Sequence, residues 1–371
     1  MSYSKGQVFD LELDRDSILR VVDFRLEKTN EYTWKDYATR SFYHLRDGDC
    51  KEALRDLEQA FEIIDTAIDG QLYVQKALIL RCLNEKEEAV VALESIDIYT
   101  AEFSVFESAS NIAADLEEWG LAIRFTDLCL SFNDTSWNAH YVKGLSLSNI
   151  NADDSLAYYH LKTSLTLIRK YPAHSEMAMV ANGLAYFFLK REKWDSAVIY
   201  LHYSLDSLGF PLEDDFNVAF KLGVCYFYLG DYEHAIKYLK KQTNKEEYYN
   251  ALYFNARSLE HLGRAKQAIP IYSIIIEDED QENESLAIVH RGFCFYNTGD
   301  FLKAIEDLDE AISNEYNKAP KVYFYLALSY VQVNNKDKAC KTIRNGLKKC
   351  GRIGTEQREF YQRLSELDLE C

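Results

Sequence analysis

Pairs of small residues recur along this 371-residue chain at a nearly constant spacing, and they restrict its fold more than any other feature. Eight pairs stand twelve positions apart, and a ninth stands thirteen apart. They are Ser41 and Ala53, Ala77 and Ala89, Ser110 and Ala122, Gly144 and Ala157, Ala185 and Ala197, Gly223 and Ala235, Ala256 and Ala268, Gly292 and Ala304, and Ala327 and Ala339. Their first members follow one another at intervals of 33 to 41 residues. Self-similarity at such a period is typical of repeat architectures.

Residues 291–312, RGFCFYNTGDFLKAIEDLDEAI, show what one unit encodes. Apolar residues recur at helical spacing before and after Gly299 and Asp300. Glycine adopts the left-handed conformation that ends a helix, and a carboxylate at the next helix start satisfies free N–H groups. The unit is therefore predicted to be a helical hairpin, with Gly292 and Ala304 small because the two helices cross closely.

The period and the small-residue pattern resemble the tetratricopeptide repeat family, most closely in residues 221–239, KLGVCYFYLGDYEHAIKYL. The resemblance covers roughly residues 34 to 350. It implies an all-α fold, an α-solenoid of about nine helical hairpins in a right-handed superhelix. In this family the concave face is lined mainly by the first helix of each hairpin. Each unit is stabilised by stacking on its neighbours.

The two ends of the chain are predicted to cap this array. Residues 1–33 form an N-terminal region whose segment 14–29 carries Ile18, Leu19, Val22 and Leu26 on one stripe. Residues 34–354 form the tandem array, and residues 355–371 form a C-terminal capping helix that begins near Thr355. Terminal helices of this kind shield the last apolar face from water.

Charge and hydropathy exclude several partner classes. The net charge of −18 repels phosphate backbones and anionic lipid, so neither nucleic acid nor a membrane is an expected partner. No segment approaches the roughly 18 uncharged apolar residues of a membrane-spanning helix, and the N-terminus lacks a secretory pattern. The eight cysteines form no CxxC pair. We therefore expect a reducing, cytoplasmic location and no disulfide framework.

Motifs for catalysis are absent from the sequence. It contains no GxxxxGK[ST], HExxH or GxSxG, and its histidines are scattered without ligand spacing. We predict no catalytic residues, no metal site and no cofactor, and hence no enzyme activity.

The inward-facing positions that the resemblance implies are rich in aromatic residues. They follow each first small residue by one or four positions, or precede it by three. The candidate partner-binding residues are Tyr186, Phe220, Phe227, Tyr253, Arg257, Phe293, Tyr296 and Phe324. Family members that grip a C-terminal carboxylate use Lys and Asn at such positions, so that clamp is not supported here. Aromatics at these positions serve equally well as packing between units, and the sequence leaves the two readings open.

The sequence therefore predicts a non-catalytic scaffold that binds a protein or peptide segment on this face. Two alternatives stay open: a peptide-sensing regulator, and an accessory or neutralising subunit that binds an enzyme or toxin. Residues 336–363 carry a basic excess that would suit an acidic surface. Self-association is undecided.

Overall fold

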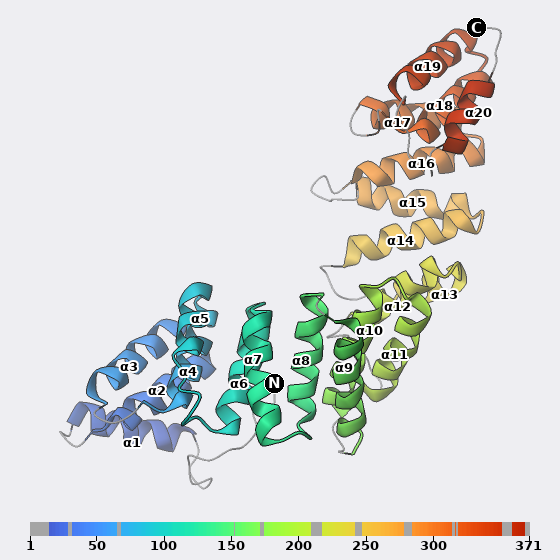
Figure 1. Cartoon of the computed structure of the whole chain (residues 1–371). Coiled ribbons are helices and arrows are strands. Elements are labelled where there is room, and N and C mark those ends of the chain that lie inside the picture. Colours follow the sequence, from blue (N-terminus) through green and yellow to red (C-terminus); the bar gives the residue numbers. More distant parts are fainter. Residues whose placement is uncertain are drawn as a thin grey trace. The chain divides into compact units, whose positions relative to one another are not determined.

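The computed structural model describes residues 15–28, 32–64, 68–151, 153–170, 174–208, 217–241, 247–277, 284–313, 316, 318–350 and 358–367. These residues form twenty α-helices and no strand (Figure 1). The helices are α1 (Arg15–Lys28), α2 (Trp34–Asp47), α3 (Cys50–Ile63), α4 (Gly70–Cys82), α5 (Lys86–Glu94), α6 (Phe103–Asp115), α7 (Trp119–Phe132), α8 (Trp137–Asn149), α9 (Asp154–Ile168), α10 (His174–Leu189), α11 (Trp194–Leu208), α12 (Val218–Tyr228), α13 (Tyr232–Leu239), α14 (Tyr248–His261), α15 (Ala265–Ile276), α16 (Glu284–Thr298), α17 (Phe301–Ser313), α18 (Pro320–Gln332), α19 (Lys336–Lys349) and α20 (Arg358–Glu366).

The helices from α2 to α19 pair in chain order as nine hairpins among the described residues, which confirms the predicted all-α array. Helix α1 packs on α2 through the predicted stripe, whose Val22 is buried. Helix α20 packs on α18 and α19, and its Leu364 is fully buried. The expected start at Thr355 lies outside the described residues, and the boundaries at 33 and 354 stay predictions.

Two compact units make up the chain, Met1–Phe187 and Phe188–Cys371. The first unit contains a buried cluster centred on Phe106, Phe125 and Leu93. The second contains clusters around Tyr272 and around Phe293. Each unit thus carries its own apolar core.

The small residues lie where the two helices of a hairpin touch. A Cβ atom on Gly292 would stand 2.9 Å from the Leu308 side chain, and one on Gly144 would stand 2.7 Å from that of Leu161. In the first hairpin the hydroxyl of Ser41 donates to the carbonyl of Ala53 at 2.7 Å. The predicted close crossing is confirmed, because a larger side chain would push the helices apart.

Every hairpin turn contains a residue in the left-handed conformation, whether or not it is glycine. Gly299 has φ of 87°, as the sequence predicts, and the backbone N–H of Asp300 then donates to the carbonyl of Phe295. The nine turn residues are Gly48, Asn84, Glu117, Asn151, Glu192, Gly230, Gly263, Gly299 and Asn334. The backbone bond that closes the turn is what requires positive φ.

The expectation of a chain without disulfides is wrong for Cys50 and Cys82. These residues are disulfide-bonded, with their Cα atoms 6.2 Å apart. Cys50 begins α3 and Cys82 ends α4, so the stacking of consecutive hairpins brings together two thiols that are 32 residues apart in sequence. Cys129, Cys225, Cys294 and Cys350 are free and buried. The cytoplasmic location stays a prediction, and the disulfide counts against it because such bonds are uncommon in reducing compartments.

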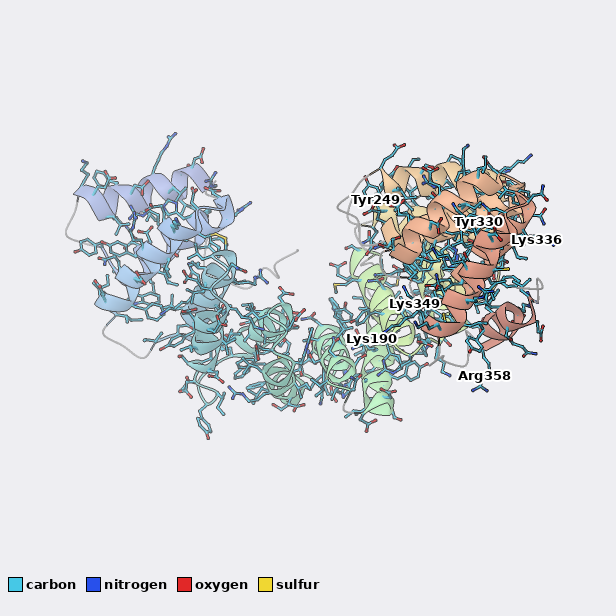
Figure 2. The ribbon with its side chains drawn as sticks, turned by 90° about the horizontal axis from the view of Figure 1, so that it is seen from above. Lys190, Tyr249, Tyr330, Lys336, Lys349 and Arg358 are labelled. Atoms are coloured by element: carbon cyan, nitrogen blue, oxygen red, sulfur yellow. A yellow bond between two sulfur atoms is a disulfide. The ribbon has the colours of Figure 1, made fainter. Side chains whose placement is uncertain are left out.

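No described helix is both long and apolar enough to cross a membrane. The predicted basic excess lies largely on α19, whose two ends are marked by Lys336 and Lys349 in Figure 2. Lys336, Lys338, Lys341, Lys348 and Lys349 are all exposed.

Candidate functional site

Seven of the eight candidate residues lie on successive first helices of the second unit. Phe220 and Phe227 come from α12, Tyr253 and Arg257 from α14, Phe293 and Tyr296 from α16, and Phe324 from α18. These four helices contact one another in that order, and α18 also contacts α20. The hairpin repeat therefore places one aromatic group after another along a single line of helices.

Ring contacts join these residues into one surface, which we name the aromatic face. Phe227 meets Phe254 of α14 with ring centroids 5.2 Å apart. Tyr296 meets Tyr325 of α18 at 5.1 Å. Phe324 meets Phe360 of α20 at 6.1 Å. The face comprises Phe220, Phe227, Tyr253, Phe254, Arg257, Phe293, Tyr296, Phe324, Tyr325 and Phe360.

Exposure separates the seven predicted residues of this face into two kinds. Phe293 is only 3% exposed and packs against Tyr325 with ring centroids 4.8 Å apart. The other six are half-buried, so part of each side chain reaches solvent. Phe293 therefore supports the face from below, while Phe227, Tyr253 and Tyr296 are available for contact.

Tyr186, the eighth candidate, belongs to the first unit. It lies on α10, is 38% exposed and donates its hydroxyl proton to Asn149 Oδ1 at 3.4 Å. The aromatic face is built from residues of the second unit alone, so Tyr186 is not part of it.

Glu260, which the sequence analysis did not single out, is the centre of a polar network beneath the face. Its Oε2 atom accepts from the Tyr272 hydroxyl at 3.1 Å and from His290 Nδ1 at 2.9 Å. Arg257 donates through Nη1 to His290 Nε2 at 3.1 Å. Because arginine only donates, His290 must accept at Nε2 and carry its proton on Nδ1, which makes it neutral.

Two further bonds fix the Arg257 guanidinium. Its Nη1 atom also donates to the Tyr253 hydroxyl at 3.3 Å, and Nη2 donates to His261 Nε2 at 3.3 Å. Its Nε atom lies 3.6 Å from Glu260 Oε2 and has no hydrogen-bond partner within the described structure. The guanidinium is thus held in place, with its Nε donor left unused.

Burial and charge shift the pKa values in directions that agree with this assignment. Burial lowers the pKa of His290, against the opposing effect of Glu260. Burial alone would raise the pKa of Glu260, but the His290 hydrogen bond and the Arg257 charge bring it below its usual value. Burial also lowers the pKa of His261. The carboxylate is therefore ionised while both histidines are neutral.

Lys321 of α18 is the second cation of the site, and it is held by aromatic rings. Its Nζ atom lies 4.5 Å from the centre of the Phe293 ring and 5.4 Å from that of Phe360. Within the described residues, no carboxylate lies within ion-pairing distance of this ammonium group. Burial lowers the pKa of Lys321, the Glu260 charge opposes this shift, and the Arg257 charge acts in the same direction as burial.

The hairpins and one sequence match relate the chain to a known repeat. The profile of the tetratricopeptide repeat matches residues 216–244, which include the α12–α13 hairpin. The same small-residue pair and positive-φ turn recur in all nine hairpins. Residues 216–244 are thus a tetratricopeptide repeat, and the other hairpins resemble it. Proteins built from this repeat generally mediate protein–protein interactions, and no curated protein matches the sequence.

Solved structures resemble the chain at low sequence identity. The apo quorum sensor NprR from B. thuringiensis is 13% identical, with 85% of this chain and 97% of that one covered and a TM-score of 0.49. A tetratricopeptide repeat protein from Parabacteroides merdae is 16% identical, with 80% and 98% covered and a TM-score of 0.41. MamA from Desulfovibrio magneticus is 18% identical, with 47% and 95% covered and a TM-score of 0.42.

Proposed function

We propose that this protein is a non-catalytic scaffold that binds a segment of a partner protein on the aromatic face of its second unit. The observation that carries the proposal is the series of half-buried aromatic rings on α12, α14, α16, α18 and α20. Aromatic side chains supply most of the binding energy in protein interfaces, because they bury a large area at a small entropic cost.

The shape of the face favours a segment laid across several helices over a small molecule. Its rings come from the five helices α12, α14, α16, α18 and α20. Ring contacts join α12 to α14, α16 to α18 and α18 to α20. A helix or an extended chain with apolar residues at regular intervals matches such a series. Tyr253 and Tyr296 also carry hydroxyls, which give the face polar groups for hydrogen bonds to the backbone of a bound segment.

A random-peptide library selected on the full chain tests this proposal. We expect the selected peptides to bind a Phe227→Ala, Tyr296→Ala, Phe324→Ala variant at least about tenfold more weakly, since each lost ring removes a contact worth about 1 kcal/mol or more. The matched control is Leu302→Ala on α17, a second helix of the same unit, where Leu302 is 72% exposed.

Circular dichroism of each variant checks that the hairpins remain folded. Equal binding to wild type, the triple variant and the control would place the peptides elsewhere and refute the role of the aromatic face.

A further inference from the structure

Charges at the aromatic face do not cancel. Arg257 and Lys321 are cations, Glu260 is the anion beside Arg257, and His261 and His290 are neutral. The group therefore carries one excess positive charge, in a chain whose net charge is −18. A cation without a counter-ion that is partly removed from water loses solvation free energy. A negative charge on a bound partner would offset that loss.

Glu260 is already committed elsewhere in the network. Its Oε2 atom accepts two hydrogen bonds, from Tyr272 and His290, and lies 3.6 Å from Arg257 Nε. The carboxylate forms no ion pair with Lys321. The bonds from α15 and α16 therefore hold the one internal anion away from the ammonium group.

The aromatic rings attract the Lys321 ammonium but cannot satisfy its donors. A ring face offers a negative quadrupole and no lone pair directed at an N–H group. The ammonium has three donors, and within the described residues none has a protein acceptor. A carboxylate that reached this position would accept two of them in a charge-assisted bond.

We propose that the partner segment carries an aspartate or glutamate side chain, flanked by apolar residues, and that this carboxylate binds Lys321 Nζ with support from the Arg257 charge. The proposal rests on the proposed function of the aromatic face. Phe324 and Tyr325 lie one turn along α18 from Lys321, so they are placed to contact the apolar residues beside the acid.

A single carboxylate fits the site better than a phosphate group or a polyanion. One negative charge balances the excess of one positive charge, whereas a phosphate near −2 would leave a surplus beside Glu260. The −18 charge of the whole chain opposes a polyanion further.

The test compares Lys321→Met with Lys338→Met in the library selection on the full chain. Methionine keeps the length and the ring contacts of lysine but removes its charge. Lys338 of α19 is the matched control because it also lies over a ring, that of Tyr330 at 5.3 Å, but its side chain is exposed. Lys321→Arg keeps the charge and serves as the rescue variant.

We expect peptides selected on the wild type to share an acidic residue at one position. Replacing it by Gln or Asn should weaken binding to wild type, Lys338→Met and Lys321→Arg at least about tenfold. It should have little effect on binding to Lys321→Met, because the interaction is then already lost.

Three results would overturn the inference while leaving the proposed function intact. Peptides could need the aromatic rings but share no acid, or the acid-to-amide change could weaken binding to Lys321→Met as much as to wild type. Alternatively, amidation of the peptide C-terminus could abolish binding while the side-chain change does not, which would assign the site to a terminal carboxylate. If no selected peptide depends on the aromatic rings, the proposed function itself fails.

Discussion

The two units bury histidines in opposite ways. In the first unit, His140 and His160 lie with their Nδ1 atoms 2.7 Å apart, and His140 Nε2 lies 3.0 Å from the carbonyl oxygen of Asp134. Because that carbonyl must accept, His140 carries its proton on Nε2 and accepts at Nδ1 from His160. In the second unit, His290 lies between Glu260 and Arg257.

The difference between the two buried polar groups lies in their net charge, which determines whether a group can bind a charged partner. The His140–His160 pair is neutral and its two rings bond to each other, so it leaves no charge for another molecule. The Glu260 network is charged, and with Lys321 it holds more positive than negative charge. The histidine pair joins the two helices of one hairpin and the Glu260 network joins two first helices, but only the network leaves a cation for a partner to bind.

Removing Glu260 should have the largest effect on stability, and only in the second unit. Glu260→Ala leaves His290 and Tyr272 without their shared acceptor and Arg257 without its neighbouring carboxylate, and the Glu260 side chain is only 15% exposed. We expect α14 and α16 to lose about 3 to 5 kcal/mol of protection against opening, as for other broken buried ion pairs. Amide hydrogen exchange on the full chain measures the free energy of opening for α14 and α16 separately. A local measurement is needed because repeat arrays do not unfold in one step.

Glu233→Ala is the matched control for this change. Glu233 also pairs with an arginine, Arg264, but its side chain is 57% exposed. We expect at most about 1 kcal/mol there, since water replaces an exposed partner. Similar losses in the two variants would show that the Glu260 network is not the stabilising centre described above.

The array could be predicted from sequence because close helix crossing leaves little choice of residue. Gly144 and Gly292 are small for the same steric reason, so their spacing reveals the hairpins. The turns were harder to predict. Positive φ recurs in all nine, but only four of the turn residues are glycine, and Glu117 or Glu192 gives no local signal.

The candidate site was predictable only in part, for a physical reason. The repeat position alone identifies Phe227 and Tyr296, because it fixes which side of a first helix they occupy. Glu260 and Lys321 acquire their roles from contacts between different hairpins and from which carboxylate is already paired. The disulfide between Cys50 and Cys82 was missed likewise, since it depends on how two hairpins stack.

Acid should weaken the histidine pair of the first unit before it affects the carboxylate of the second. Burial lowers the pKa of His140, and it lowers that of His160 from 6.5 to about 4. Between these pH values the unfolded chain binds protons that the folded pair does not bind. The contribution of the pair to the free energy of unfolding is therefore fully present above about pH 6.5 and falls as the pH decreases toward 4. Lys143 opposes protonation of both rings, while Asp127 and Asp134 favour it.

The loss from His160 should reach up to about 3 kcal/mol at pH 4. Urea unfolding followed by the fluorescence of Trp137, on the same helix as His140, measures it in a chain whose other tryptophans, Trp34, Trp119 and Trp194, are replaced by Phe. His160→Gln should flatten the decline between pH 6.5 and 4, whereas His234→Gln, at an exposed histidine in the second unit, should not. An unchanged pH profile in His160→Gln would show that the pair does not control this transition.

The smallest expected effect concerns what the two units share, the hairpin turn. Glu117 in the first unit and Glu192 in the second have φ of 60° and 53°, and both are exposed. A glutamate in this conformation is strained by its Cβ, whereas glycine is not. We expect Glu117→Gly and Glu192→Gly each to stabilise their unit by about 0.5 to 1 kcal/mol, after the added flexibility of glycine in the unfolded chain is subtracted.

Glu117→Ala removes the same side-chain atoms beyond Cβ but keeps the strain, so it should give no gain in thermal unfolding. A gain from Ala equal to that from Gly would mean that charge, and not backbone strain, limits these turns. Similar gains from Gly in both units would show that the backbone solution is common to them and that only their buried polar groups differ.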